Sequence, residues 1–251
     1  MARRLANPNT PTIEVQRGCW DWHWQNWRER KTINEWVLKR GERVLRILES
    51  LALVRPTILD LGCGMGWFSQ ELSRFGSVTG IDLSEEAIAK AQARYPHVTF
   101  MAGNALTHSL PAGKFDVVVS QEVLAHVDDQ AKFMQVAAAA LRPGGYLIVT
   151  TANRFVTDRL EEGWDPWPRG HIETFVDRKG LKRLLSPHFR VLRMSSMIFV
   201  GQKGILRLVN SAKLNAVLSL LIPKRYLEDW KGRAGLGYCL IALAQKRDPG
   251  P

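Results

Sequence analysis

Apolar residues recur at two different spacings along the chain. Between residues 33 and 53 they return every three or four positions, which predicts an amphipathic helix. Farther on, short apolar runs alternate with longer helical patterns, and the runs lie at 57–61, 77–82, 98–100, 114–120 and 144–152. Because strands that alternate with helices form parallel sheets, we predict an α/β fold with a doubly wound, mostly parallel sheet.

Capping signals and two later runs complete the expected architecture. Ser84 followed by two acidic residues predicts a helix start, and Pro143 predicts the end of a helix over 129–141. Runs at 189–197 and 237–245 bring the sheet to seven strands. We therefore divide the chain into an N-terminal aromatic and helical flap (1–54) and a core (55–247), with a basic amphipathic insertion at 201–234 before the last strand.

Composition places the chain among ordinary globular proteins. Of its 251 residues, 45% are hydrophobic and 24% are charged. No signal peptide is expected, because the start MARRLANPNT lacks an apolar run of the required length. No spanning helix is expected either, because charged and amide residues interrupt the longest apolar region, 205–222. The three cysteines are odd in number and lack metal-ligand spacing, which suits reduced thiols. We expect a cytoplasmic protein.

Charge is distributed unevenly along the chain. The formal charges of residues 1–46, 47–177 and 178–247 are +5, −6 and +13, and Asp248 brings the total to +11. The basic C-terminal third is either a solvated face or a surface for an anionic partner such as lipid headgroups, phosphate or nucleic acid.

A glycine loop follows the first predicted strand, in the sequence DLGCGMGW (60–67). Its glycines allow a ligand to approach the backbone, but Trp67 stands where a dinucleotide fingerprint has its last glycine. This disfavours a nicotinamide oxidoreductase. Asp82 ends the second strand, 20 residues after Gly62, where a carboxylate can accept both hydroxyl hydrogens of a ribose. The pattern favours an adenosine-containing ligand.

Four segments resemble successive motifs of the class I S-adenosylmethionine-dependent methyltransferases: ILDLGCGMGWFSQEL, VTGIDLSEEAIAKAQ, GNALTHSLPAGKFDVVVSQEVLAHV and LRPGGYLIVTT. The resemblance covers about residues 56–152 and implies S-adenosylmethionine as cofactor. The resemblance implies that Asp60, Gly62 and Gly64 surround the methionine end of the cofactor. It also implies that Asp82 holds the ribose and that Leu83 and the Asn104–Ala105 pair flank the adenine. Where many relatives have aspartate, Asn104 would meet the adenine amino group through its side-chain carbonyl. The implied cofactor residues are Asp60, Gly62, Cys63, Gly64, Gly66, Asp82, Leu83, Asn104, Ala105 and Gln121.

Two further segments resemble those of a narrower group, the ubiquinone-biosynthesis O-methyltransferases: SQEVLAHV and PWPRGHIETFVDRKGLKRLL. In that group two glutamates and a histidine after the fourth strand are associated with a divalent cation. This chain has Glu122, Ala125 and His126 there, so one carboxylate is missing. Magnesium requires near-octahedral oxygen coordination, so we expect no metal and keep Glu122 and His126 as an alternative metal pair.

Methyl transfer to a hydroxyl benefits from a base, and two histidines lie at the ligand-binding edge of the predicted sheet. His126 follows the fourth strand and His171 follows the fifth. Either imidazole can titrate near neutral pH, so both are candidate catalytic residues. A structural role as a hydrogen-bonded histidine remains open for each.

The acceptor pocket is expected from the segments outside the shared core. Trp20, Trp24, Trp164 and Trp167 are the candidate pocket residues, as a lid over a flat or apolar acceptor. The alternative is that the N-terminal tryptophans pack as part of the core. The insertion has the same ambiguity: its apolar stripe either packs on the sheet, which we favour, or lies on an anionic membrane with basic residues toward the headgroups.

These features predict a methyltransferase that acts on the oxygen of a small, apolar or aromatic acceptor. Nitrogen or carbon methylation of a natural product or lipid-like molecule remains an alternative. A nucleic-acid methyltransferase is a second one, because the basic charge suits phosphates. However, base N-methylating enzymes often have Asn/Asp-Pro-Pro-aromatic after the fourth strand, where this chain has SQEVLAH. A non-catalytic cofactor-binding protein also remains open.

Overall fold

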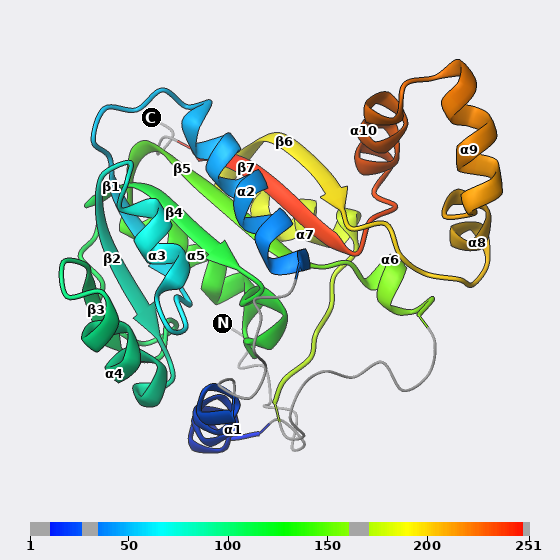
Figure 1. Ribbon diagram of the computed structural model, residues 1–251. Coiled ribbons are helices and arrows are strands. Elements are labelled where there is room, and N and C mark those ends of the chain that lie inside the picture. Colours follow the sequence, from blue (N-terminus) through cyan, green and yellow to red (C-terminus); the bar gives the residue numbers. More distant parts are fainter. Residues whose placement is uncertain (1–10, 27–34, 161–170, 248–251) are drawn as a thin grey trace.

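The computed structural model describes residues 11–26, 35–160 and 171–247, and its centre is a seven-stranded sheet (Figure 1). The strands are β1 (Thr57–Leu61), β2 (Ser77–Asp82), β3 (Thr99–Ala102), β4 (Phe115–Gln121), β5 (Leu141–Ala152), β6 (Phe189–Met197) and β7 (Cys239–Lys246). Their order is β3-β2-β1-β4-β5-β7-β6. Strands β1 to β5 pair in parallel, and β7 is antiparallel to both neighbours. The predicted doubly wound, mostly parallel sheet is confirmed.

Helices cover both faces of this sheet. On one face, α2 (Glu35–Glu49), α3 (Trp67–Leu72) and α4 (Glu85–Arg94) pack through residues such as Val44, Phe68 and Ile88. On the other, α5 (Gln130–Ala140) and α7 (Arg178–Leu185) pack through residues such as Phe133 and Leu181. Each helix thereby buries one apolar side, and the sheet is the middle of three layers.

Most boundaries match the periodicity, and the differences are local. Strands β2 and β6 have the predicted limits, and Ser84 caps α4 by accepting a hydrogen bond from the Ala87 amide at 3.0 Å. Helix α5 ends at Ala140, one residue before its expected end, but β5 begins at Leu141, three residues before the expected start at 144. The chain enters β5 directly because Leu141 already pairs with Phe115 of β4, and the proline lies where that ladder changes register.

The two N-terminal helices have different surroundings. Helix α2 belongs to the core, because Val44 and Leu48 are buried against β1 and α3. Helix α1 (Ile13–Asn26) instead lies away from the sheet, on the side to which β2 and β4 point, and it contacts α4 (Figure 1). Only α1 therefore occupies the position expected of a flap.

The insertion forms a helical lobe that projects beyond β6 and β7 (Figure 1). We use the term insertion lobe for residues 201–234, which include α8 (Ile205–Val209), α9 (Ala212–Leu221) and α10 (Lys224–Ala234). Leu206 and Leu227 are buried, and α10 packs on β6. Helix α9 has no buried side chain, so the expectation that the apolar stripe packs on the sheet is wrong for α9.

Among the described residues, no helix combines the length and the apolar character needed to cross a bilayer. Cys63 and Cys239 are free thiols, and burial raises the pKa of both. Two short elements follow the strands. Helix α6 (Arg154–Thr157) follows β5, and a 3₁₀ turn over Leu124–His126 follows β4. Both lie at the carboxyl edge of the parallel strands, where ligands of such sheets bind.

Candidate functional site

The loop after β1 depends on glycine at two positions. Gly62 and Gly64 have φ angles of 89° and 51°, which residues other than glycine rarely adopt. A Cβ atom at Gly62 would overlap the Val123 side chain, and one at Gly64 would lie 2.7 Å from the Trp24 indole. The loop is therefore confined between the end of β4 and α1, with its backbone exposed to the space between them.

Two acidic side chains lie under this loop. At the end of β2, Asp82 accepts hydrogen bonds from the Gly64 amide (2.8 Å) and the Ser84 amide (3.0 Å). In β1, Asp60 accepts a hydrogen bond of 2.6 Å from the Ser69 hydroxyl. Asp82 thus fixes the glycine loop to the start of α4.

Burial makes both carboxylates costly to ionise. It raises the pKa of Asp60 to about 7, against the effect of the Ser69 hydrogen bond, and the negative charge of Asp82 adds to the increase. Burial also raises the pKa of Asp82. Neither carboxylate forms an ion pair with a residue that the structure describes, so the site favours a ligand that brings positive charge.

One cavity of about 850 Å³ contains both acidic groups. Its lining includes Asp82, Leu83 and Asn104, which lie at or after the ends of β2 and β3, Gln121 and His126, which lie at and after the end of β4, and Arg40 of α2. Nine of the ten residues expected to bind cofactor line this cavity: Asp60, Gly62, Cys63, Gly64, Asp82, Leu83, Asn104, Ala105 and Gln121. The tenth, Gly66, instead precedes α3 and faces Phe100. The structure thus brings together residues from five strand ends or loops.

Asn104 has a partner that the sequence does not reveal. Its Oδ1 accepts a hydrogen bond of 2.9 Å from the Leu106 amide. The side-chain carbonyl expected to meet an adenine amino group is therefore already shared with the backbone, while the Nδ2 group remains a donor by its chemistry. The interaction orients the amide at the cavity wall.

Helix α1 forms the roof of the cavity. Gln16, Trp20, His23 and Trp24 all line it, and their spacing of four, three and one residues places them on one side of the helix. Trp20 and Trp24 were expected in the pocket, whereas Gln16 and His23 were not. The other expected pocket tryptophans, Trp164 and Trp167, lie outside the described residues.

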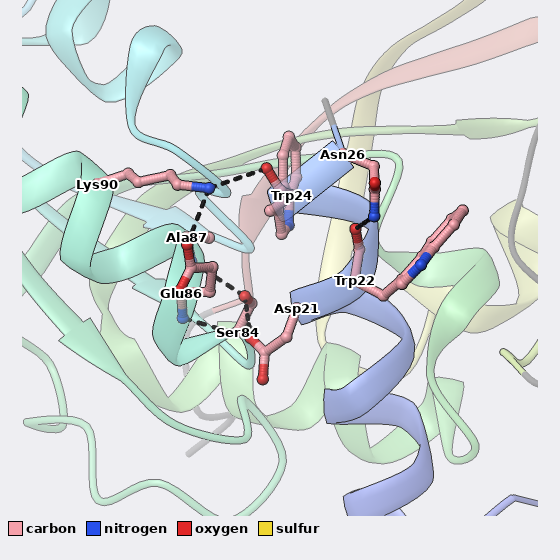
Figure 2. Close-up of polar contacts among 8 residues, drawn as sticks. All are labelled: Asp21, Trp22, Trp24, Asn26, Ser84, Glu86, Ala87 and Lys90. Atoms are coloured by element: carbon pink, nitrogen blue, oxygen red, sulfur yellow. Dashed lines mark hydrogen bonds and ion pairs between the residues drawn. The ribbon is translucent and has the colours of Figure 1, made fainter. Parts of the chain in front are cut away.

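A second side of α1 is fixed to α4, as Figure 2 shows. The Asp21 carboxylate accepts hydrogen bonds from the Ser84 hydroxyl and, at 3.3 Å, from the Glu86 amide. Lys90 donates to the Trp24 carbonyl at 3.1 Å, while Trp22 points away from α4. A carboxylate at a helix N-terminus is stabilised by the helix dipole, so Asp21 joins the roof to the loop that follows Asp82.

His126 and His171 have different positions. His126 Nδ1 lies 2.8 Å from the Ile172 carbonyl, which only accepts, so Nδ1 carries the proton and Nε2 the lone pair. Burial, together with the nearby His171 and His23, lowers the pKa of His126 to about 4 against the effect of the Ile172 hydrogen bond. His171 lies behind it, with ring centroids 5.3 Å apart, and its Nε2 is 3.1 Å from Glu173 Oε1. Of these two candidate catalytic histidines, His126 lines the cavity and His171 does not.

Arg40 is a cavity residue that sequence reasoning missed. Its Nε donates to Gln121 Oε1 at 3.1 Å, and another guanidinium nitrogen lies 3.8 Å from Glu122. Glu122 also accepts a hydrogen bond of 3.0 Å from the Thr150 hydroxyl. Glu122, one of the two candidate metal ligands, thus already forms an ion pair with Arg40. In the described part of the chain, no three His, Cys, Asp or Glu side chains are grouped as metal ligands.

Comparison with known proteins places these motifs in a family. Residues 59–149 match the model of a methyltransferase domain. A ubiquinone biosynthesis O-methyltransferase of Methylobacterium is 37% identical over 140 residues, 51% of this chain and 56% of that protein. A probable S-adenosylmethionine-dependent methyltransferase of Mycobacterium tuberculosis is 38% identical over 123 residues, 49% of this chain and 44% of that protein. The chain thus spans about half the length of the curated relatives it matches.

The fold extends the likeness beyond the matched motifs. The N-methyltransferase NodS of Bradyrhizobium japonicum, solved with S-adenosylhomocysteine, superposes with a TM-score of 0.65 at 20% identity over 93% of this chain and 100% of that one. At that identity the likeness shows the fold. The chain therefore contains a methyltransferase domain over residues 59–149 and has the fold of the class I S-adenosylmethionine-dependent methyltransferases.

Proposed function

We propose that the chain transfers the methyl group of S-adenosylmethionine to a hydroxyl oxygen of a small, apolar or aromatic acceptor. One observation carries this proposal: a single cavity is lined both by the acidic residues Asp60 and Asp82 and by Trp20 and His126, whose ring centroids are 5.0 Å apart. Cofactor and acceptor would therefore lie side by side. Oxygen as the acceptor atom is further supported by the curated relatives named as O-methyltransferases.

The cofactor end suits the charges of S-adenosylmethionine. When bound, the cofactor supplies a methyl group activated by a sulfonium cation. Asp82 would accept the ribose hydroxyl hydrogens, and Leu83 with Asn104 would flank the adenine. Asp60 would compensate the positive charge of the ligand, and Arg40 would bind its carboxylate. The chemical basis of this fit is the presence, in the same cavity, of Arg40 and of two buried carboxylates that have no ion-pair partner among the described residues.

The acceptor end provides orientation and a base. Trp20 and Trp24 present flat apolar surfaces to the cavity, and orientation of reacting groups alone can lower a barrier by about 7 to 11 kcal/mol. We assign His126 as the base, because its Nε2 carries the lone pair and its ring is neutral at physiological pH. His171 would act as a positioning residue that packs against His126 and Trp20.

A matched acceptor series tests the proposal. The protein is incubated with S-adenosylmethionine labelled in its methyl group and with aromatic compounds that differ only in bearing a hydroxyl, an amino group or an activated ring carbon. We expect labelled methyl ethers as the main product. Transfer to nitrogen or carbon alone would reject oxygen as the acceptor, and binding of cofactor without any transfer across a broad panel would favour a non-catalytic role.

The raised pKa of Asp60 predicts how cofactor affinity depends on pH. Since a bound cation favours the ionised carboxylate, Asp60 must lose its proton on binding below its free pKa of about 7. Affinity for S-adenosylmethionine should therefore be constant above pH 7 and fall by up to about tenfold per pH unit below it. Calorimetry between pH 5.5 and about 8.5 measures this, with Asp60→Asn as the matched variant.

Asp60→Asn should remove that pH dependence, and it should also change the stability of the ligand-free protein. Because the folded-state pKa exceeds the usual value of 3.8, ionising Asp60 costs stability as the pH rises from about 4 through 7. The variant should consequently melt at a higher temperature than the wild type at pH 8. An equal pH slope of affinity in both proteins would show that another group titrates.

A further inference from the structure

Exposed apolar side chains are concentrated in the insertion lobe. Of the fifteen large hydrophobic residues that are exposed in the described chain, nine lie between residues 205 and 230. They are Ile205, Leu208, Leu214, Val217, Leu220, Leu221, Ile222, Tyr226 and Trp230. Apolar patches of this kind on a folded protein commonly mark surfaces that contact a partner or a membrane.

Helix α9 contributes most strongly to this surface. Leu220 and Leu221 are 84% and 83% exposed, and no side chain of the helix is buried. Its polar side chains are only Lys213, Asn215 and Ser219. A helix that is apolar over most of its circumference is ordinarily covered, so this surface requires an apolar environment outside the described chain.

The charge of the lobe indicates which environment fits. Residues 201–234 contain seven basic and two acidic residues, a net charge of +5. The two acids, Glu228 and Asp229, already pair with Lys224 (3.9 Å) and Arg233 (2.9 Å) on the same helix. Three other basic residues, Lys203, Arg207 and Lys213, have no carboxylate partner among the described residues. Lys203 precedes α8, Arg207 lies in α8 and Lys213 lies in α9, so all three belong to the same segments as the exposed apolar residues.

We propose that the insertion lobe docks on the anionic surface of a lipid bilayer. The apolar residues of α9 would enter the boundary between headgroups and acyl chains, and Lys203, Arg207 and Lys213 would bind headgroup phosphates. Tyr226 and Trp230, four residues apart on α10, are of the residue types enriched at membrane interfaces. A second copy of the chain fits less well, because it would oppose a lobe of the same positive charge.

The lobe is attached at the edge of the sheet that carries the cavity. At the end of β5, the Asn153 side chain donates to the carbonyls of Gly235 and Gly237, both at 2.8 Å. Lys231 points inward and donates to Asn215 at 2.7 Å, so it belongs to the lobe interior and not to the docking surface. The docking proposal rests on these surface features alone and is independent of methyl transfer.

Vesicle sedimentation tests the docking with the full chain. The probes are vesicles of phosphatidylcholine alone and of phosphatidylcholine mixed with phosphatidylglycerol in equal amounts. We expect binding to the anionic vesicles at low salt and release as the ionic strength increases. The double variant Leu220→Ser/Leu221→Ser should lower binding at least tenfold. The triple variant Lys203→Gln/Arg207→Gln/Lys213→Gln should lower it by a factor of about five for each charge removed.

Matched controls separate the lobe from general effects of hydrophobicity and charge. Val54 is 92% exposed at a distant site, so Val54→Ser should leave binding unchanged, as should Arg43→Gln. Because the changed α9 side chains are exposed, melting temperatures should stay near that of the wild type. Absence of binding at low salt would overturn the proposal. So would self-association that is abolished by Leu220→Ser/Leu221→Ser without vesicle binding, since it would assign the surface to a second copy.

Discussion

Replacing Asp82 by alanine is expected to weaken the binding of S-adenosylhomocysteine at least about a hundredfold, or about 2.7 kcal/mol. The carboxylate would lose its hydrogen bonds to the ribose, and charge-assisted bonds contribute about 1.5 to 3 kcal/mol each. It also holds the Gly64 and Ser84 amides, so its removal loosens the loop that forms the cofactor end. Isothermal titration calorimetry of the two proteins measures the effect.

Asp129 offers a matched control for this variant. Its carboxylate caps α5 by accepting a hydrogen bond of 2.8 Å from the Lys132 amide, away from the cavity. Asp129→Ala should therefore cost about 1 kcal/mol of folding stability and leave affinity unchanged. If Asp82→Ala binds S-adenosylhomocysteine as tightly as the wild type does, the assignment of this cavity end to the ribose is wrong.

Replacing His126 by alanine is expected to lower kcat by about a hundredfold to ten-thousandfold, the usual contribution of a general base. Affinity for S-adenosylhomocysteine should change little, because His126 lies at the acceptor end of the cavity. With saturating cofactor, kcat of the wild type should stay constant down to about pH 5, since the pKa of His126 is about 4. Turnover of an accepted hydroxyl compound, followed from pH 5 to about 9, gives both quantities.

Two variants separate the base from its surroundings. His126→Asn keeps a donor for the Ile172 carbonyl but has no basic nitrogen, so it should fold normally and remain as slow as His126→Ala. His171→Ala removes the packing behind His126 and the contact with Glu173 but leaves the His126 ring in place, and we expect a loss of less than about tenfold together with a lower melting temperature. A greater loss of turnover in His171→Ala than in His126→Asn would assign the base to His171.

The periodicity of the chain was sufficient for most of the sheet. Strands such as 57–61 and 77–82 are short runs with buried apolar residues between clear start and stop signals, so their limits follow from the sequence. The cofactor end was similarly accessible, because Gly62, Gly64 and Asp82 belong to motifs that lie close together along the chain. Their positions relative to one another are fixed by strand pairing, in which Asp60 of β1 lies beside Gly80 of β2.

The rest of the cavity was less accessible because its residues come from distant segments. Arg40 meets Gln121 across 81 positions of sequence, and His126 meets Ile172 across 46. Contacts between residues so far apart cannot be predicted from the spacing of residues within a short segment. The stripe of Gln16, Trp20, His23 and Trp24 does have helical spacing and could have identified one side of α1, but its mixed polarity hid it from a search for apolar periodicity.

The exposed helix α9 illustrates a different limit. Its apolar residues have the spacing of a helix that packs on a sheet, and sequence alone gives no information about which surfaces are near enough to receive it. In the structure α10 takes the position on β6, where the Ser196 hydroxyl donates to the Gly232 carbonyl at 3.3 Å, and α9 has no buried side chain. Burial is thus decided by the order of the two helices and not by their hydrophobicity.

A crystal structure of the protein with S-adenosylhomocysteine tests the central claim most directly, namely that one cavity holds the cofactor beside an acceptor site. We expect the ribose hydroxyls within hydrogen-bond distance of Asp82 and the adenine between Leu83 and Asn104. The sulfur atom should face the wall formed by Trp20 and His126. A ligand bound outside this cavity, or one whose sulfur faces away from His126, would contradict the account.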